Sequence, residues 1–253
     1  MRIEVFADND RLDARAAQLI AEVVRTVPRP VLGLATGGTP TGVYRKLREA
    51  YRNREISFRN TVTFNLDEYV GLPAEHPQSY ISYMNEHLFS HVDIPREHIH
   101  IPDGTAPDPL AECRRYDEAL ARAGRIDLQL LGLGHNGHIG FNEPGPTLNR
   151  NTHVVELSPT TREANARFFQ SLDEVPRQAI TMGIGSILHA RRIVLLVKGE
   201  DKADIVARAL TGPITTEVPA SLLQTHPDLI VLLDAAAACR LDESRIAVIR
   251  ADG

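Results

Sequence analysis

The chain lacks several features that mark specialised classes of protein. It has no tryptophan and only two cysteines, Cys113 and Cys239, in 253 residues. Two cysteines cannot form a disulfide framework, and neither lies in a spacing typical of metal ligands. So little cysteine favours a reducing compartment, and we expect a cytoplasmic protein whose thiols have no catalytic role.

Long hydrophobic runs and an excess of basic residues are also absent. The longest apolar runs, such as Leu229–Leu233, are far shorter than the ~20 residues of a membrane-spanning helix. The first residues show no apolar segment typical of a signal peptide. The formal net charge of -5 argues against a nucleic-acid partner. We therefore expect no membrane or nucleic-acid partner, whereas a small anionic ligand needs only two or three local cations.

Short apolar runs alternate with helical patterns along the whole chain, which predicts a doubly wound α/β fold. Several runs are continuously apolar, as in parallel strands covered on both faces. We expect one Rossmann-like domain over residues 1–253, with a mostly parallel sheet and helices on both faces. The expected strands are Ile3–Ala7, Val31–Ala35, Val62–Leu66, Leu128–Leu133, Val154–Leu157, Ala179–Ile184, Ile193–Val197 and Leu229–Leu233.

Three helices have clear signals. An apolar stripe marks Leu12–Val27. Asp108 and the following proline predict the start of a second helix that ends near Gly124. A third covers Asp201–Leu210. The stretch 145–176 breaks the alternation of strand and helix, and we expect it to form a lid.

Ligands of such sheets bind at the carboxyl ends of the strands. The strand at Val31 runs into Thr36-Gly37-Gly38-Thr39, and a helix begins near Pro40. Paired glycines let a ligand approach the backbone, Thr39 could cap the helix, and exposed N–H groups there suit an anion. Alternatively, this is a plain connection. Arg167 and Lys202 could complete a phosphate site, although each could equally be a solvated surface charge.

Two further loops carry groups suited to proton transfer. Asp67 and Glu68 follow the strand that ends at Leu66, where burial would raise a carboxyl pKa toward neutrality. Alternatively, Asp67 caps a turn and Glu68 faces water. His138 and Glu143 lie in a glycine-rich loop after Leu133 and could form a proton shuttle.

Two other interpretations of the glycine-rich loop are less favoured. Gly132-x-Gly134-x-x-Gly137 matches a dinucleotide fingerprint, but that fingerprint needs a helix directly after it, and Gly140 and Pro144 would break one. We therefore expect no nucleotide cofactor. His135 could join His138 and Glu143 at a zinc ion, but the helical zinc motif is missing and no cysteine is near. We expect no metal.

Together these loops resemble the glucosamine-6-phosphate deaminase (isomerase) family. The resemblance covers most of the chain. Its most specific strings are FNLDEYVGL and GHIGFNEP. The carrying segments are LGLATGGTPTGVY (32–44), TFNLDEYVGL (63–72), HPQSYISYM (76–84), LGLGHNGHIGFNEPG (131–145), TREANARFF (161–169), MGIGSIL (182–188), GEDKA (199–203) and LIVLLDAAAA (229–238).

The resemblance implies conversion of glucosamine 6-phosphate and water to fructose 6-phosphate and ammonia, without a cofactor. It implies that Thr36, Gly37, Gly38, Thr39, Arg167 and Lys202 hold the 6-phosphate. His138, partnered by Glu143, would help to open the sugar ring. Asp67 would then carry a proton between C2 and C1.

The chain departs from well-studied relatives at two places. Asn136 stands where they have an Asp that helps to charge the histidine, so His138 should depend more on Glu143. Where activated members carry Arg-x-Lys to hold an activator's phosphate, this chain has His153-Val154-Val155. We expect no activation by N-acetylglucosamine 6-phosphate. Relatives occur as monomers and hexamers, and the missing pair favours a simpler assembly, although a homo-oligomer stays open.

Three other functions remain to be weighed. A 6-phosphogluconolactonase shares the sheet and a similar glycine-histidine loop, but lacks the FNEP and DEYVG strings. A galactosamine-6-phosphate deaminase differs only in its contact with the C4 hydroxyl, which the sequence does not reveal. A non-catalytic sugar-phosphate sensor would have lost the acid–base residues, and all of them are present here.

Overall fold

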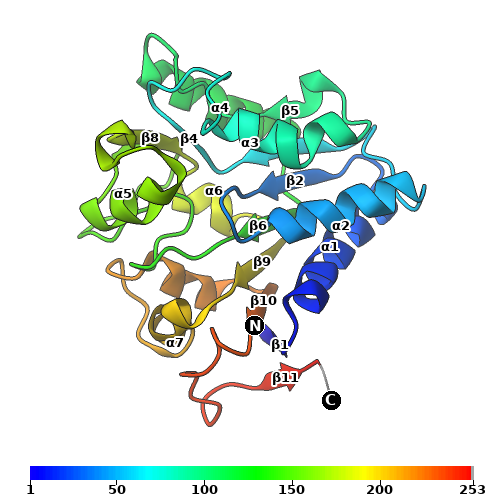
Figure 1. The fold of residues 1–253 in the computed structure, drawn as a ribbon, viewed down its shortest axis with the longest axis vertical. Helices are drawn as coiled ribbons and strands as arrows, with labels where there is room; N and C mark the ends of the chain where they lie inside the picture. The colour runs from blue at the N-terminus through cyan, green and yellow to red at the C-terminus, as the bar shows by residue number, and fades with distance from the viewer. Residues whose placement is uncertain (252–253) are drawn as a thin grey trace.

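The computed structural model describes residues 1–251 and has a large, wholly parallel sheet at its centre (Figure 1). Every neighbouring pair of strands in this sheet runs parallel. The doubly wound architecture is therefore confirmed. In spatial order the strands are β11 (Val248–Arg250), β1 (Arg2–Phe6), β10 (Leu229–Asp234), β9 (Arg192–Val197), β6 (Leu128–Leu131), β2 (Val31–Leu34), β3 (Val62–Asn65) and β5 (Ile99–His100).

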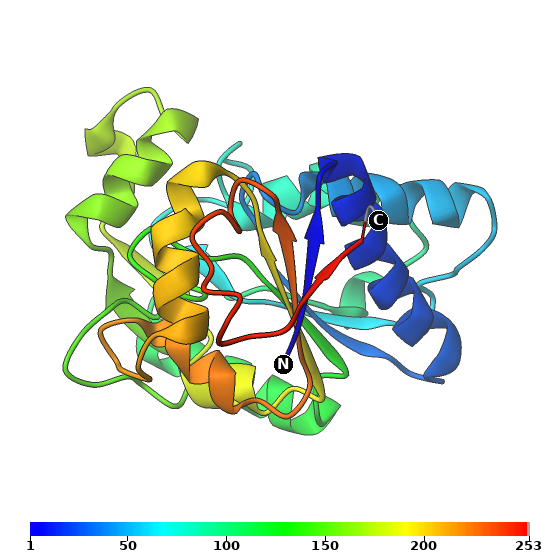
Figure 2. The same cartoon turned by 90° about the horizontal axis from the view of Figure 1, so that it is seen from below.

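Helices cover both faces of the sheet, as Figure 2 shows edge-on. One layer contains α1 (Asn9–Thr26), α2 (Thr41–Arg52) and α3 (Tyr80–His87), and the other contains α4 (Pro109–Ala123), α6 (Ile184–Leu188) and α7 (Ala203–Thr211). All residues of β2, β3, β6 and β10 are buried. These strands are therefore continuously apolar or uncharged for most of their length, since both of their faces pack against helices.

The capping signals in the sequence identify helix ends well. Asp8 and Asp108 accept hydrogen bonds from the first-turn N–H groups of α1 and α4. Gly124 ends α4 with a φ of 90°, a conformation that favours glycine. The third expected helix differs at its start, where Glu200–Lys202 forms a short 3-10 turn (η5) before α7.

A second, antiparallel sheet was not expected. It consists of β4 (Asp67–Tyr69), β8 (Gln178–Thr181) and β7 (His153–Glu156), in that order from β4 through β8 to β7. The predicted strands at Val154–Leu157 and Ala179–Ile184 thus exist, but assigning them to the main sheet was wrong. Their apolar residues indicate burial and do not specify which strand they pair with.

The stretch 145–176 contains β7, α5 (Pro159–Asn165) and the 3-10 turns η3 (Ala166–Phe168) and η4 (Leu172–Glu174). Further 3-10 turns are η1 (Phe89–His91), η2 (Arg96–His98) and η6 (Pro219–Thr225). Cys113 is buried, Cys239 is exposed, and neither is in a disulfide. Within residues 1–251, no helix is long and apolar enough to cross a membrane.

Candidate active site

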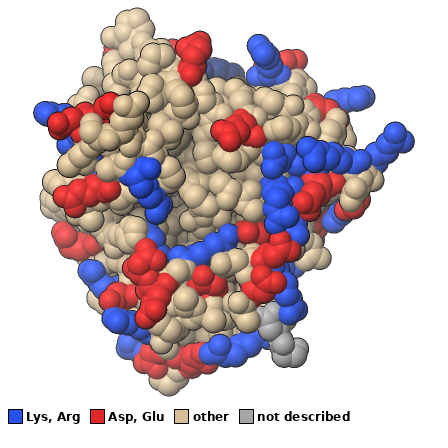
Figure 3. Space-filling model, in the orientation of Figure 1, with Lys and Arg blue, Asp and Glu red and all other residues tan. Residues whose placement is uncertain are grey.

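A pocket of about 150 Å³ opens at the carboxyl ends of β2, β3, β6 and β9. From β2 the chain crosses to β3, whereas from β6 it continues to β9 on the opposite side. The sheet therefore has a topological switch point between β2 and β6, where α/β proteins bind their ligands. The face drawn in Figure 3 is hollowed at its centre, and Lys and Arg side chains border the hollow.

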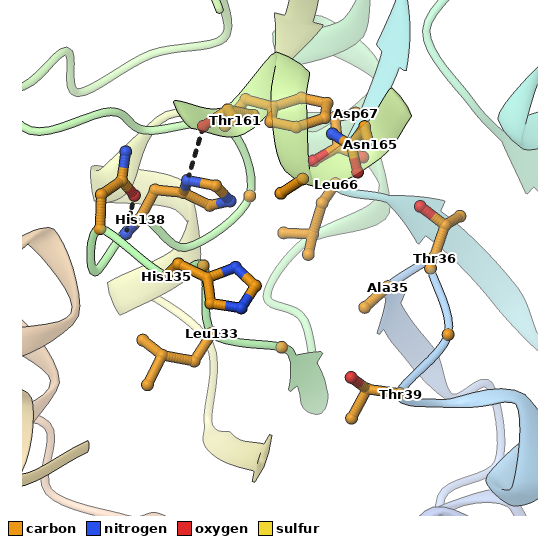
Figure 4. A pocket seen from close by; sticks show the side chains of 18 of the residues that line it. Ala35, Thr36, Thr39, Leu66, Asp67, Leu133, His135, His138, Thr161 and Asn165 are labelled. Carbon is orange, nitrogen blue, oxygen red and sulfur yellow. Dashed lines mark hydrogen bonds between the residues drawn. The ribbon is translucent and has the colours of Figure 1, made fainter. Parts of the chain in front are cut away.

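Nine of the ten predicted site residues line this pocket, and the tenth, Glu143, lies behind His138. Figure 4 shows Thr36 and Thr39 on one side of the space and His138 on the other, with Asp67 between them at the far end. The structure thus brings together loops that are far apart in the sequence.

The loop Thr36–Thr39 connects β2 to α2 and is held by two tyrosines. The hydroxyl of Tyr44 donates to Ala35 O, and that of Tyr83 donates to Gly37 O at 2.7 Å. Gly37 has a φ of 90°, which a side chain would strain. The capping role expected for Thr39 is wrong, because Pro40 is the N-cap residue and has no side-chain cap. The first N–H groups of α2 therefore lack a side-chain partner there, as an anion site requires.

Two cations face this loop from other elements. Lys202 is largely buried at the start of α7, and its ammonium donates to Leu133 O at 2.7 Å. Burial, together with the charge of the nearby Arg167, lowers the pKa of Lys202 to about 8 against the opposing charge of Asp201. Arg167 is exposed in η3, with its guanidinium 4.8 Å from the ring centre of Phe168. Both cations line the pocket.

Asp67 is the most perturbed acid in the pocket. It is buried, and burial, followed by the charge of Glu68, raises its pKa to about 8. A Cβ on Gly140 would lie 3.7 Å from Asp67 Oδ2, so the carboxyl group is close to the loop that carries His138. A carboxyl with a pKa near neutrality is suited to give and take protons.

Glu68 points away from the pocket and is buried, so the alternative in which it faces water is wrong. Its carboxylate accepts hydrogen bonds from the N–H groups of Tyr69, Tyr80 and Ile81. Burial raises the pKa of Glu68 to about 7, and these N–H groups oppose the rise. Glu68 thereby fixes the first turn of α3 against β4.

His138 and Glu143 form the centre of a hydrogen-bonded cluster. His138 Nδ1 lies 3.6 Å from Glu143 Oε2. Asn136 and Thr161 each donate to Glu143 at 2.6 Å. Burial alone would raise the pKa of Glu143, but the nearby His138 and the hydrogen bonds from Thr161 and Asn136 lower it to about 2. Glu143 is therefore a carboxylate that orients His138 and can stabilise its positive charge.

Asn136 connects this cluster to the backbone. Its amide nitrogen bonds to Glu143, and its oxygen accepts from the N–H of His138 at 3.2 Å. No helix follows Gly137, which is consistent with rejecting the dinucleotide fingerprint. Gly134 has a different role, because a Cβ there would lie 2.4 Å from the His138 ring. The ring can occupy this place only beside glycine.

Two contributors to the pocket were not identified from the sequence. Thr161 stands in the quoted TREANARFF string, yet nothing in the sequence indicated that its hydroxyl reaches Glu143. His135 was considered only as a zinc ligand, but its Nε2 lies 2.6 Å from Asp201 Oδ2. Among residues 1–251, no three His, Cys, Asp or Glu side chains are placed to hold a metal ion.

The fold and the pocket define a class of protein: an α/β enzyme whose pocket places the Thr36–Thr39 loop opposite the carboxyl and imidazole groups of Asp67 and His138. The chain belongs to the family of glucosamine-6-phosphate isomerases and 6-phosphogluconolactonases, whose model matches residues 7–231.

Curated relatives and solved structures agree with this assignment. A glucosamine-6-phosphate deaminase of Oceanobacillus iheyensis is 53% identical over 94% of this chain and 95% of its own length. One from Thermoanaerobacter pseudethanolicus is 48% identical over 94% of each chain. The solved structure of a monomeric glucosamine-6-phosphate deaminase is 47% identical, with a TM-score of 0.92. The match covers 95% of this chain and 100% of that structure's chain. A 6-phosphogluconolactonase from Trypanosoma brucei, at 24% identity and a TM-score of 0.75 over 95% of this chain and 98% of its own, shares the fold.

Proposed function

We propose that this protein converts glucosamine 6-phosphate and water to fructose 6-phosphate and ammonia. The observation that carries the proposal is that Asp67, His138 and the Thr36–Thr39 loop line one pocket. A sugar bound by its phosphate at one side would present its reacting carbons to the proton-transfer groups at the other. Relatives at about 50% identity over nearly the whole chain are glucosamine-6-phosphate deaminases.

In this proposal the N–H groups of the Thr36–Thr39 loop, Lys202 and Arg167 bind the 6-phosphate. A dianion is attracted both by the amino end of α2 and by the two cations. Arg167 would leave its stacked place on Phe168 to reach the ligand. Fixing the phosphate sets the position of the sugar carbons, which is where much of the catalytic advantage of a binding site arises.

His138 opens the ring by moving a proton from the C1 hydroxyl to the ring oxygen. The adjacent Glu143 carboxylate stabilises the imidazolium that forms during this transfer. Asn136 and Thr161 hold that carboxylate. They act as positioning residues.

Asp67 then moves the proton of C2 to C1. Loss of the C2 proton to Asp67, with O1 protonated by solvent, gives an enolamine. Return of the proton from Asp67 to C1 gives an iminium at C2, which releases one proton to solvent to become the imine. Water adds to this imine, and ammonia leaves as the C2 carbonyl forms. The pKa of about 8 for Asp67 allows the same carboxyl group to accept and return the proton.

Ammonia and fructose 6-phosphate release from glucosamine 6-phosphate tests the reaction. Galactosamine 6-phosphate and the 6-phosphogluconolactone serve as controls for the other two enzyme reactions. The proposal requires that the glucosamine substrate gives the highest kcat/KM. Equal or faster turnover of either control would overturn it, and binding without turnover would point to a sensor.

We propose further that the enzyme follows hyperbolic kinetics without an activator. His153, at the start of β7, bonds to Asn151 O, and burial lowers its pKa. With Val154 and Val155 it offers no cationic pair for a second phosphate. A sigmoidal velocity curve that N-acetylglucosamine 6-phosphate makes hyperbolic would contradict this. We also propose that the enzyme is cytoplasmic. We further propose that it is a monomer, since a 47% identical relative is monomeric. Light scattering after gel filtration measures the oligomeric state directly.

Finally, we propose that the described part of the expected domain 1–253, residues 1–251, acts as one domain and that 145–176 contains its lid. Residues 252 and 253 lie outside the described residues. Within that stretch β7 is paired to β8, so the moving part would be α5 and η3. Thr160, Asn165 and Phe168 line the pocket from these elements. Hydrogen exchange should show protection of 159–168 rising when fructose 6-phosphate binds. Equal protection with and without the ligand would remove the lid from the proposal.

A further inference from the structure

A largely buried ion pair lies behind the Thr36–Thr39 loop, outside the pocket itself. The ammonium of Lys198, directly after β9, lies 2.6 Å from Oδ1 of Asp13 on α1. The side chains are 19% and 8% exposed, respectively. The same ammonium also donates to Thr39 O at 3.2 Å. Lys198 therefore connects the end of one central strand, the first helix and the phosphate loop.

The Asp13 carboxylate also lies against the first turn of α2. A Cβ on Gly42, the second residue of α2, would lie 1.9 Å from Asp13 Oδ2. Only glycine leaves room for the carboxylate there. A negative charge beside a helix amino terminus cancels part of the positive potential of the helix dipole. At this helix the potential would serve an anionic ligand, so an uncompensated Asp13 would oppose binding.

We infer that Lys198 positions the phosphate loop and neutralises Asp13, so that the amino end of α2 remains attractive to a phosphorylated substrate. This inference rests on the proposed function, in which the loop binds the 6-phosphate. Lys198 does not line the pocket and is a positioning residue. Its effect reaches the ligand through Thr39 and through the electrostatic potential.

Electrostatics predicts an order of affinities that a purely mechanical brace would not produce. Burial raises the pKa of Asp13, so the variants are compared at a pH high enough to keep this carboxyl group ionised. In Lys198→Met the charge of Asp13 then has no partner, and the loop loses its bond to the ammonium. Asp13→Asn leaves the ammonium in place with its charge unopposed. The double variant removes both charges. Weakest binding is therefore expected for Lys198→Met, intermediate binding for the double variant, and binding as tight as wild type or slightly tighter for Asp13→Asn.

The experiment measures KM and kcat for glucosamine 6-phosphate and, by calorimetry, Kd for fructose 6-phosphate. Lys198→Met should raise KM and Kd roughly tenfold or more, since one unit charge acts on a nearby dianion across a medium of effective dielectric constant ~20. Its kcat should change much less. Lys46→Met is the matched control. Lys46, on α2, pairs with the exposed Asp10 of α1, the helix that also carries Asp13. This variant should behave as wild type.

Thermal unfolding of each variant separates folding from binding. Unchanged KM and Kd in a folded Lys198→Met variant would overturn the inference. Equal weakening in all three variants would also overturn it, because breaking the bridge mechanically is the same event in each. A wild-type enzyme that binds fructose 6-phosphate but does not turn over glucosamine 6-phosphate would overturn the proposed function, and the order of Kd values would still decide on Lys198.

Discussion

Replacing Asp67 by Asn separates catalysis from stability at one buried side chain. Asn keeps the shape of the carboxyl group but cannot carry the proton between C2 and C1. We expect kcat to fall about 100-fold or more, within the ~10²–10⁴-fold range of general acid–base catalysis. KM should change little, because the phosphate is bound by other residues.

The same substitution should stabilise the protein at alkaline pH. Burial, then the charge of Glu68, raises the pKa of Asp67 from 3.8 to about 8. Protonated Asp67 therefore contributes its full stability below pH 3.8, the pKa of the unfolded state. This contribution is lost as the pH rises through the folded-state pKa of about 8. At 1.36 kcal/mol for each pH unit, the loss is at most about 6 kcal/mol. Relaxation around the charge reduces it, and we expect a gain of a few kcal/mol for Asp67→Asn above about pH 8.

A coupled assay of fructose 6-phosphate release measures kcat. Thermal unfolding at pH 5 and pH 9 measures Tm. Asp67→Asn should have a clearly higher Tm than wild type at pH 9 and a smaller advantage at pH 5. Glu22→Gln, which changes an exposed acid on α1, should alter neither kcat nor Tm. Wild-type kcat in Asp67→Asn would remove Asp67 as the proton carrier. A lower Tm at pH 9 would refute the view that its buried charge destabilises the fold.

Three further predictions concern the groups around His138. Gly134→Ala places a methyl group 2.4 Å from the His138 ring and should lower kcat about 100-fold by displacing the ring. Gly145→Ala, whose added Cβ would have no neighbour closer than 3.8 Å, should leave kcat unchanged. Equal kcat in the two variants would show that the ring position does not matter. Thr161→Val removes a hydroxyl group 2.6 Å from Glu143. It should lower kcat roughly tenfold, the effect expected from losing one hydrogen bond to a charged group, and Thr161→Ser should restore kcat. No recovery in Thr161→Ser would indicate a packing effect. Asn136→Asp puts a second carboxylate beside Glu143. The acid limb of the pH profile of kcat/KM should therefore shift to higher pH by about one unit or more. An unshifted acid limb would mean that residue 136 and Glu143 are not coupled.

Much of the fold could be predicted because local patterns report burial and helix ends. The apolar runs of β2, β6 and β10 mark strands covered on both faces, and Asp108 and Gly124 mark the ends of α4. The small antiparallel sheet could not be predicted. The apolar residues of β8 are buried and those of β7 are half-buried. The pairing of β8 depends on β4, which follows β3 after a single residue.

The residues of the site were identifiable because each follows a strand and belongs to a specific string. Their surroundings were not. Thr39 was expected to cap α2, but its carbonyl instead accepts from Lys198, and Glu68 is buried under the first turn of α3. Such contacts join segments that are far apart in the sequence, and residue spacing does not encode them.

The sequence by itself determined the chemistry that this protein can perform. Carboxyl, imidazole and cationic groups at strand ends, in strings shared with one family, specify a sugar phosphate and proton transfer. Only the tertiary structure decided how these groups are tuned. Burial raises the pKa of Asp67, hydrogen bonds lower that of Glu143, and Lys198 offsets Asp13 behind the phosphate loop. Desolvation and charge compensation depend on distances in space, and folding alone sets those distances.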